Sequence, residues 1–467
     1  MTKKRKVLLG ITGLLIIICL AMATLALWTK NFTQTSTNKM AINCVKIEFM
    51  DFSNTVINAQ YSYPISDEEG LNTDPYVVEI VNKCPYAVSY DVILNELKEN
   101  TLSPSYAKIA VNDSYGLLVN FPETDTISSL EDEMDRSWIV SGGIIGANST
   151  RTLETRAWIT ESATTSQALN KHLAFEMAID VTIGVNGNYL ASKILASNTL
   201  FESSPDFTAA PTDETSGLYQ MEDDKGMSYY FRGIIDSNYV SFAGKLWRIV
   251  RINGDGSTRL IAEDSVSDSP FNTTNNNHKY VGYTYDNSHN CTNANPCNGS
   301  EGTASTIKTY LDNWYNTNLK SYEDKIVTGD YCNDTSYRLS GSTRYYGAYD
   351  RRISSATHPV LTCPDTSVNY GGKYKLKLGL LTADEMVLAG YTRSSSTTNS
   401  YLEKSSWWWS FSPSYSDTNY AFVFSASSTF HYSGTSSSGG VRPVINLKAD
   451  TKVTAGDGSA SNPYIIK

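Results

Sequence analysis

Residues 173–181 read LAFEMAIDV, and the alternation of their side chains decides how the first half of the chain is expected to fold. Leu173 and Phe175 begin an apolar set at every second position, and Glu176 lies in the set between them. Successive side chains of a strand point to opposite faces, so the pattern is typical of a strand with one face on a core.

Two further stretches share this period of two. Residues 76–94, YVVEIVNKCPYAVSYDVIL, predict two strands around a turn at Asn82 to Pro85, because proline cannot join a central ladder. Residues 151–159, RTLETRAWI, predict another strand. Helical periodicity is scarce here, so we expect an all-β sandwich or jelly roll over residues 38–200.

The N-terminus has the pattern of a membrane anchor. Basic residues fill positions 3–6, and an uncharged, mostly apolar run of 22 residues follows at positions 7–28. A bilayer-spanning helix needs about 20 such residues, and the positive flank favours a cytoplasmic N-terminus. We therefore expect residues 1–6 in the cytoplasm, a signal anchor at 7–28, and a single-pass protein of the cell membrane with its C-terminal part extracellular. A cleaved signal peptide ending near Ala21-Met22-Ala23 is the alternative.

The charge balance excludes one class of partner. Beyond residue 28 the chain carries 34 basic and 48 acidic residues, a formal net charge of −14. Such a surface repels phosphate backbones, so nucleic acid is not expected to bind.

Six cysteines lie outside the apolar N-terminal run. An even number in an oxidising compartment indicates disulfides, and no Cys-x-x-Cys pair supports zinc as the alternative. Six cysteines allow fifteen pairings, so the connectivity stays open. Spacing favours three pairs: Cys44–Cys84, Cys291–Cys297 and Cys332–Cys363. We expect no metal and no cofactor.

The second half has a mixed pattern behind a linker. Residues 201–215 are polar, contain proline and lack periodicity, which is typical of a linker. Residues 216–467 then combine strand patterns with an Asn-Gly-Asp-Gly hairpin turn at 253–256. Helices are predicted at 305–319 and 382–390, each behind a capping residue. We expect an α+β domain, and a multidomain chain overall.

The first half also resembles a known family. An anchor followed by SYPISDEEGLNTDPYVVEIVNKCPYAVSYDVIL and RTLETRAWITESAT resembles the TasA/camelysin-type sandwiches of Gram-positive surface and biofilm proteins. The resemblance implies the scaffold and self-assembly into fibres or matrix. Some members are described as metalloproteases, but this chain has no His-Glu-x-x-His motif, and His172 and Glu176 lie in a strand-like run.

The second half resembles the C-terminal module of an uncharacterised Gram-positive surface-protein family. The motifs are GLYQMEDDKGMSYYFRG, LWRIVRINGDGSTRLI, TIKTYLDNWY, GLLTADEM and GGVRPVINL, in this order. The ending is similar to modules of C-type-lectin or formylglycine-generating-enzyme fold, which implies a C-type-lectin-like architecture. The calcium motifs of sugar-binding lectins are missing from the sequence, and so are the enzyme's paired active-site cysteines if Cys332 and Cys363 are structural.

Three consecutive tryptophans stand in SSWWWSFSPS, residues 405–414. The family resemblance implies that Trp409 lies in the core. Side chains alternate along a strand, so Trp408 would face the other way and is the candidate for exposure, with a covered packing role as the alternative.

Aromatic residues near the C-terminus are the candidate binding residues, because tyrosines among Ser, Thr, Asn and Gly supply rigid contact area beside adaptable hydrogen bonds. The expected ligand is a carbohydrate, or a protein of a host or neighbouring cell. The candidates are Trp408, Tyr415, Tyr420, Phe430, His431 and Tyr432.

No catalytic residues are predicted. The acidic run Glu222-Asp223-Asp224 fits a solvated turn, Arg442 fits a structural role, and no Gly-x-Ser-x-Gly elbow is present. We therefore expect a non-enzymatic adhesin or ligand-binding protein. The alternatives are a structural component of surface fibres or matrix, and an enzyme on a lectin-like scaffold.

Overall fold

The computed structural model describes fifteen segments of the chain: residues 45–49, 56–59, 63–84, 87–112, 114–124, 136–146, 148–183, 189–201, 203–285, 302–351, 358–363, 371–392, 399–416, 420–424 and 431–467. The expected anchor at 7–28 lies outside them, as do Cys44, Cys291, Cys297 and Phe430. Within these segments, no helix has both the length and the apolar character needed to cross a bilayer.

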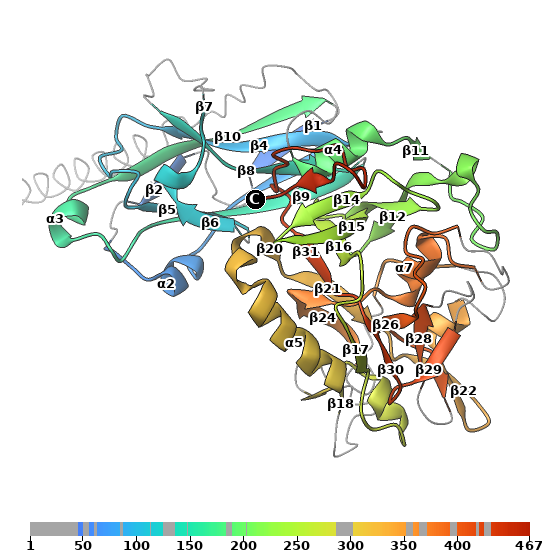
Figure 1. Ribbon diagram of the computed structural model, residues 1–467. Coiled ribbons are helices and arrows are strands. Elements are labelled where there is room, and N and C mark those ends of the chain that lie inside the picture. Colours follow the sequence, from blue (N-terminus) through green and yellow to red (C-terminus); the bar gives the residue numbers. More distant parts are fainter. Residues whose placement is uncertain are drawn as a thin grey trace, which may run out of the picture.

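The chain is mostly β-sheet and forms two lobes that lie against each other (Figure 1). The first lobe, residues 45–183, holds two five-stranded antiparallel sheets in the orders β1-β3-β9-β5-β6 and β2-β10-β4-β8-β7. Its strands are β1 Val45–Phe49, β2 Val56–Ala59, β3 Tyr76–Asn82, β4 Val88–Glu96, β5 Ala107–Val111, β6 Ser114–Leu117, β7 Glu123–Thr124, β8 Ser137–Ile145, β9 Ser149–Ile159 and β10 Leu173–Ile183. Its short helices are α2 Asp67–Leu71, α3 Thr165–Ala168 and the 3₁₀ turn η1 Leu118–Asn120.

The alternating stretch 173–181 forms all but the last two residues of β10. Leu173 and Phe175 are fully buried in the core that the two sheets share, as expected. Glu176 on the other face is also buried, and the amide of Asn95 on the neighbouring β4 donates to its carboxylate over 3.3 Å, which offsets part of the cost of burial. The predicted strands at 76–94 are present as β3 and β4, but they belong to different sheets.

The second lobe, residues 189–467, is built on a ten-stranded sheet with the path β11-β12-β13-β15-β16-β31-β20 and with β14, β25 and β32 beside it. A five-stranded sheet, β17-β30-β26-β28-β29, and three small sheets, β18-β19, β21-β24 and β22-β23-β27, complete it.

The bounds of the second lobe's elements are as follows. The strands are β11 Leu200–Phe201, β12 Gly217–Asp223, β13 Gly226–Arg232, β14 Tyr239–Phe242, β15 Lys245–Ile252, β16 Thr258–Ala262, β17 Ser267–Pro270, β18 Thr284–Tyr285, β19 Thr303–Ala304, β20 Ile326–Val327, β21 Gly329–Asn333, β22 Tyr337–Ser340, β23 Thr343–Tyr346, β24 Gly372–Leu376, β25 Leu378–Gly379, β26 Trp408–Pro413, β27 Tyr415–Ser416, β28 Tyr420–Phe424, β29 His431–Gly434, β30 Ser438–Val441, β31 Val444–Leu447 and β32 Tyr464–Ile465. The helices are α4 Leu190–Ser197, α5 Thr306–Asn318, α6 Gly347–Tyr349 and α7 Ala383–Leu388, with 3₁₀ turns η2 Asp213–Thr215, η3 His278–Val281 and η4 Lys320–Lys325.

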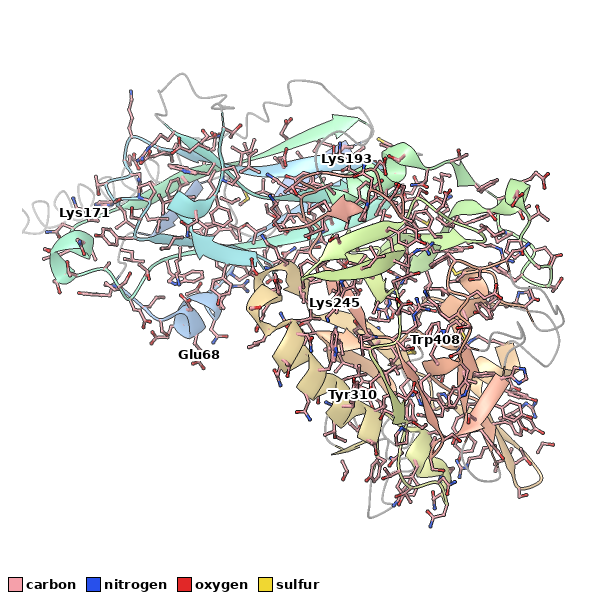
Figure 2. All side chains as sticks on the ribbon, in the orientation of Figure 1. Glu68, Lys171, Lys193, Lys245, Tyr310 and Trp408 are labelled. Atoms are coloured by element: carbon pink, nitrogen blue, oxygen red, sulfur yellow. A yellow bond between two sulfur atoms is a disulfide. The ribbon has the colours of Figure 1, made fainter. Side chains whose placement is uncertain are left out.

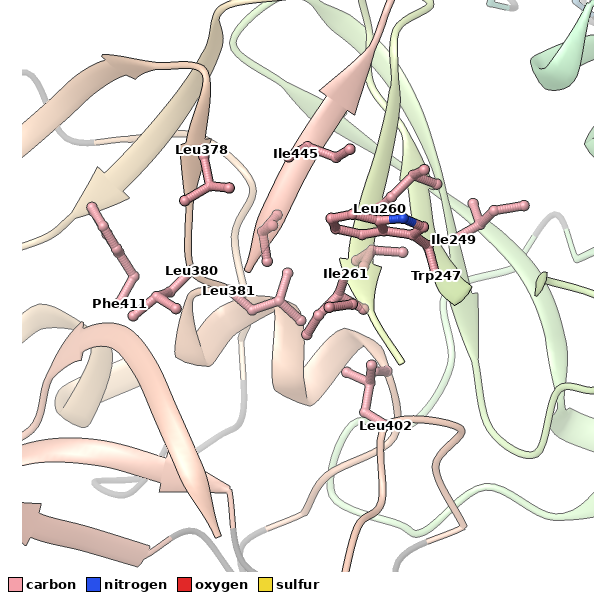
Figure 3. Close-up of a cluster of buried hydrophobic side chains, with 14 of the residues drawn as sticks. Trp247, Ile249, Leu260, Ile261, Leu378, Leu380, Leu381, Leu402, Phe411 and Ile445 are labelled. Carbon is pink, nitrogen blue, oxygen red and sulfur yellow. The ribbon is translucent and has the colours of Figure 1, made fainter. Parts of the chain in front are cut away.

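One continuous apolar core joins the large sheet to the helices of this lobe. Trp247 and Leu260 of the β15-β16 hairpin meet Leu381 and Leu402 in its centre (Figure 3). The hairpin turn falls where the sequence predicts it, and Gly256 adopts φ +81°, which glycine tolerates without strain. The hairpin therefore presents its turn residues at a fixed edge of the core.

The two predicted helices are confirmed. Ser305 caps α5 by accepting from the backbone N–H of Lys308, and Ile307 and Leu311 are buried. Thr382 and Glu385 form the expected capping box of α7, after which Gly390 adopts φ +117°. The helix α4 was not expected, because its eight residues make only about two turns and give little helical periodicity, but it buries Leu190 and Ile194 in the second lobe's core.

The predicted linker packs on the second lobe along part of its length. Phe201 stacks on Tyr219 with 4.8 Å between ring centroids. The buried guanidinium of Arg232 donates to the backbone carbonyls of Asp206 and Ala209 over 3.1 and 3.0 Å. These polar contacts have no periodic signature in sequence.

One disulfide of the predicted set is confirmed. Cys332 and Cys363 are bonded with 5.6 Å between their Cα atoms. Cys84 is also disulfide-bonded.

Candidate functional site

The tryptophan run is part of the core. Trp408 is 1% exposed and Trp409 is fully buried, so the expected exposure of Trp408 is wrong, whereas Trp409 lies in the core as expected. Figure 2 places Trp408 inside the second lobe. Alternation does turn Trp408 away from Trp409, but that face is covered too. Phe424 on β28 stacks on the Trp408 ring at 3.5 Å, and the guanidinium of Arg442 lies 4.5 Å from its centroid.

Arg442 has the structural role that the sequence predicts. It is fully buried and donates to the backbone carbonyls of Ala262 and Leu402 over 2.9 and 3.0 Å. Burial lowers its pKa to about 10. Arg442 therefore connects the segments around Ala262, Leu402 and Trp408 through two hydrogen bonds and one ring contact.

Three of the predicted binding residues do meet at the surface. Tyr415 of β27, Tyr420 of β28 and Tyr432 of β29 form a triangle with ring centroids 4.6 to 5.6 Å apart. Tyr345 of β23 stacks beside Tyr415 at 6.1 Å, and Tyr349 of α6 contacts both at 5.1 Å. We call these five side chains the tyrosine patch.

The patch is partly open to solvent. Tyr432 is 42% exposed, and the other four rings are half-buried against one another. Burial and a hydrogen bond with Tyr432 raise the pKa of Tyr415, so its hydroxyl stays protonated. His431 precedes Tyr432 in β29, and strand alternation turns its side chain to the opposite face.

Two arginines border the patch on the β22-β23 hairpin. Arg338 lies over the ring of Tyr345 at 4.4 Å, and Arg344 lies over the ring of Tyr337 at 4.0 Å. Sequence reasoning identified neither these arginines nor Tyr345 and Tyr349, because the residues that join them to the patch lie about 70 positions away.

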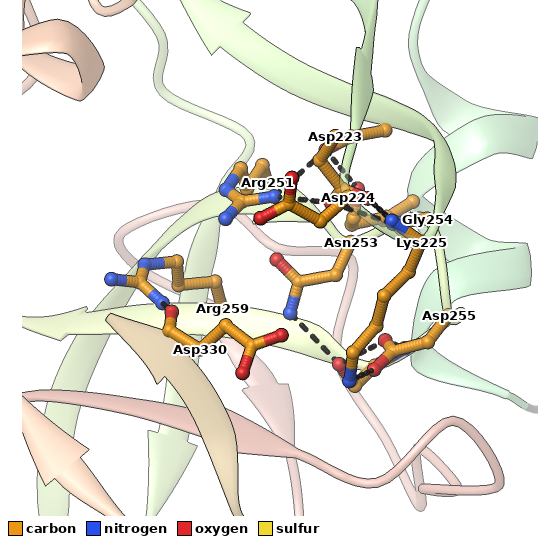
Figure 4. Close-up of polar contacts among 12 residues, drawn as sticks. Asp223, Asp224, Lys225, Arg251, Asn253, Gly254, Asp255, Arg259 and Asp330 are labelled. Carbon is orange, nitrogen blue, oxygen red and sulfur yellow. Dashed lines mark hydrogen bonds and ion pairs between the residues drawn. The ribbon is translucent and has the colours of Figure 1, made fainter. Parts of the chain in front are cut away.

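A second candidate site is a charged cleft beside the disulfide, which the sequence did not predict. Its charged lining comes from the end of β12 with the turn after it, the β15-β16 hairpin, β21 with the residue after it, Arg351, β24 and the start of α7. Figure 4 shows the side chains of the first two. The residues that line it are Asp223, Asp224, Lys225, Arg251, Asn253, Asp255, Arg259, Gly329, Asp330, Cys332, Asp334, Arg351, Val360, Leu361, Thr362, Cys363, Lys373, Thr382, Asp384, Glu385 and Ser412.

The predicted solvated turn at 222–224 is therefore wrong for Asp223. Its side chain is 7% exposed and accepts from Arg251 over 2.7 Å and from the backbone N–H of Gly254 over 2.9 Å. A Cβ on Gly254 would lie 2.5 Å from the Asp223 carboxylate, so only glycine permits this approach. Glu222 is exposed, as expected.

Glu385 links the floor of the cleft to α7. Its carboxylate lies 2.7 Å from Nε of Arg259 and 3.2 Å from Nε of Arg251, and it also caps the helix through the backbone of Thr382. Farther along, Arg351 pairs with Asp334 and Asp384 at 2.8 and 2.9 Å. Burial alone would lower the pKa of Arg351, but these two carboxylates raise it.

The charges at the rim are also paired. Asp224 accepts from Lys373 over 2.7 Å and from the backbone N–H of Cys363 over 3.2 Å, which joins the turn to the disulfide. Lys225 pairs with Asp255 at 2.6 Å. Within the described segments, no three His, Cys, Asp or Glu side chains are placed to hold a metal ion. The arrangement has room for a small polar group.

Comparison with known proteins adds no family. No protein-family model matches the chain, and no curated protein matches it.

Proposed function

We propose that the chain is a non-enzymatic binding protein of the cell surface that recognises a carbohydrate through the tyrosine patch. The observation that carries the proposal is the meeting of Tyr415, Tyr420 and Tyr432 in one partly exposed cluster. These residues come from three different strands, and the cluster is continued by Tyr345 and Tyr349.

The chemistry of the patch suits a sugar. Tyrosine offers an apolar ring face for the C–H face of a pyranose, and its hydroxyl can exchange hydrogen bonds with sugar hydroxyls. Because the five rings already restrain one another, little side-chain entropy would be lost when a ligand binds.

A protein ligand is the alternative. Tyrosine and arginine are both enriched in the residues that dominate protein–protein binding, and Arg338 and Arg344 border the patch. The same variants therefore have to be tested on both classes of ligand.

The test compares Tyr432→Ala and Tyr420→Ala with the unmodified chain on glycan and protein arrays. Tyr63→Ala is the matched control, since Tyr63 is 78% exposed on the first lobe. We expect both patch variants to lose at least tenfold in affinity for a glycan that the control still binds. Loss on the protein array alone would move the proposal to a protein ligand. Retained binding by both patch variants would overturn it.

The surface location is part of the proposal and rests on the basic positions 3–6 and the apolar run 7–28. We propose a C-type-lectin-like architecture for residues 216–467. In support, β14 near the start of this region pairs in parallel with β32 at its end. Protease accessibility of the second lobe on intact cells tests the location. Release of the chain from membranes by salt alone would contradict an anchor.

The alternatives make different predictions. An assembly role predicts concentration-dependent fibres of the chain. An enzyme using a free thiol at Cys332 or Cys363 is not supported, since these two cysteines are bonded to each other.

A further inference from the structure

Asn253 holds a fixed place at the turn of the β15-β16 hairpin. Its backbone N–H donates to the carbonyl of Ser257 over 2.8 Å, and its carbonyl accepts from Gly256 over 2.8 Å. The residue is 8% exposed, and its side chain lines the charged cleft. The hydrogen bonds around its side chain determine which of Oδ1 and Nδ2 faces the cleft.

A series of hydrogen bonds from the core determines the orientation of the Asn253 amide. The carbonyl of Val444 can only accept, so the hydroxyl of Tyr331, 2.7 Å away, donates to it. That hydroxyl then accepts from Nδ2 of Asn446 over 3.2 Å. Oδ1 of Asn446 is left to face Asn253, whose Nδ2 donates to it over 2.9 Å.

A second chain reaches the same result from the turn. The carboxylate of Asp255 has a pKa of about 2, since Lys225 and Ser257 outweigh the effect of burial, so it is ionised and can only accept. The hydroxyl of Ser257 therefore donates to Asp255 and accepts from Nδ2 of Asn253 over 2.8 Å. Both N–H groups of the Asn253 amide are now used.

The amide oxygen of Asn253 is consequently turned to the cleft. In Figure 4 it points into the space bordered by Arg251, Arg259 and Asp330. It is buried, and no donor in the described part of the chain reaches it. A buried acceptor without a donor is uncommon in native structures, and such a group is satisfied by a water molecule, an ion or a ligand.

The charges around this oxygen favour a cationic donor. Seven carboxylates and five cationic side chains line the cleft. The buried arginines are committed to carboxylates, Arg251 to Asp223 and Glu385, and Arg259 to Glu385. Asp330 also pairs with Lys375, which lies outside the lining, so seven carboxylates face six cations. The remaining surplus is of oxygen acceptors, which complement an N–H donor of positive charge.

The size of the cleft limits the occupant. Its cavity volume is about 50 Å³, which is room for a few water molecules or for the head of a small group, and too little for a complete sugar ring. Primary ammonium is a compact cation with three N–H donors and fits both limits.

We propose that the charged cleft binds a primary ammonium group, with the amide oxygen of Asn253 as one acceptor and the surrounding carboxylates as counter-charge. The ammonium can come from a lysine side chain of a peptide or from an amino sugar, and the chemistry is shared by the two. This inference does not depend on the tyrosine patch.

Calorimetric titration of the full-length chain tests the proposal with two matched pairs of probes. One pair is Nα-acetyl-lysine amide and its Nε-acetylated form, and the other is glucosamine and N-acetylglucosamine. We expect each ammonium probe to bind at least tenfold more tightly than its acetylated partner. The pair with the larger difference in affinity shows whether the ammonium group comes from a lysine side chain or from an amino sugar. Equal affinities for the ammonium and acetylated probes in both pairs, or no binding of either, would mean that the cleft does not recognise the ammonium group. Either result would overturn the proposal.

Variants at the rim locate the binding without disturbing the network around Asn253. Asp330→Asn removes one lining carboxylate, which pairs with Lys375 and has a side chain that is 21% exposed. We expect this variant to weaken ammonium binding at least threefold. Asp264→Asn makes the same charge change at a side chain that is 83% exposed and outside the cleft, and should leave binding unchanged. Equal weakening by both variants would reduce the effect to overall charge and contradict a site in the cleft. Tyr432→Ala should not alter ammonium binding, which keeps this test separate from that of the tyrosine patch.

Discussion

Glu385 and Arg259 form an ion pair of 2.7 Å in which neither side chain is more than 3% exposed. The same carboxylate pairs with Arg251, and Arg251 pairs with Asp223. This network joins α7, the β15-β16 hairpin and the end of β12. Its members are desolvated together, so each depends on the others for its charge to be tolerated in the core.

Neutralising Glu385 should therefore be strongly destabilising. Glu385→Gln leaves Arg259 buried without a carboxylate, and removing one partner of a buried pair costs about 3–5 kcal/mol. We expect a loss of this order in the free energy of unfolding measured with urea. Glu323→Gln removes a carboxylate whose side chain is 41% exposed, and should change the free energy by less than about 1 kcal/mol. Equal effects would contradict a buried network.

Acid should weaken the hairpin through Asp255. Burial alone would raise the pKa of Asp255, but Lys225, Arg151 and Ser257 lower it from 3.8 to about 2. A lowered folded-state pKa contributes stability above the unfolded value, which is lost as the pH falls from about 4 to about 2. The contribution is about 2 kcal/mol.

Asp255→Asn removes this contribution. In urea unfolding, we expect the variant to be about 2 kcal/mol less stable than the unmodified chain at pH 6, and the difference to shrink at pH 3. Asp264→Asn serves as the control because its side chain is 83% exposed. A difference that stays constant between the two pH values would rule out the proposed ionic role of Asp255.

Local sequence patterns predicted much of the fold. The alternation of 173–181 predicted β10, and the capping residues Ser305 and Thr382 predicted the starts of α5 and α7. These signals are short in range, because a strand or a helix start is decided by neighbours along the chain. The strand pairing was not predictable in this way, and β3 and β4 lie in different sheets although five residues separate them.

The candidate sites were predicted less well, for a physical reason. Tyr415, Tyr420 and Tyr432 are close in sequence and were predicted, whereas Tyr345 joins them through strand pairing of β23 with β27. The charged cleft depends on partners still farther apart, such as Asp223 and Glu385. A run of acidic residues resembles a solvated turn unless the buried arginine that faces it is known.

Trp408 should act on stability and not on ligand binding. Its ring is 1% exposed and lies against Phe424 and Arg442, so Trp408→Ala leaves a large cavity and should cost about 3–5 kcal/mol in urea unfolding. Trp408→Phe keeps a ring at this position and should cost less. Tyr432→Ala, at a ring that is 42% exposed, should cost about 1 kcal/mol or less. A Trp408→Ala chain as stable as the unmodified one would contradict the buried position.

The Cys332–Cys363 disulfide should support both candidate sites. It closes a loop with a sequence separation of 31, and that loop carries Tyr345 and Tyr349 of the tyrosine patch, while the two cysteines line the charged cleft. Cross-linking a loop of this length stabilises the fold by about 3–4 kcal/mol on the chain-entropy account. We expect the double variant Cys332→Ser/Cys363→Ser to lose stability of this order in urea unfolding, and to bind a ligand of the patch more weakly at temperatures where it is still folded. Ser340→Ala, at an exposed position in the same loop, is the control. Unchanged stability in the double variant, or free thiols at both cysteines in peptide mapping of the unmodified chain, would show that the bond does not hold this loop.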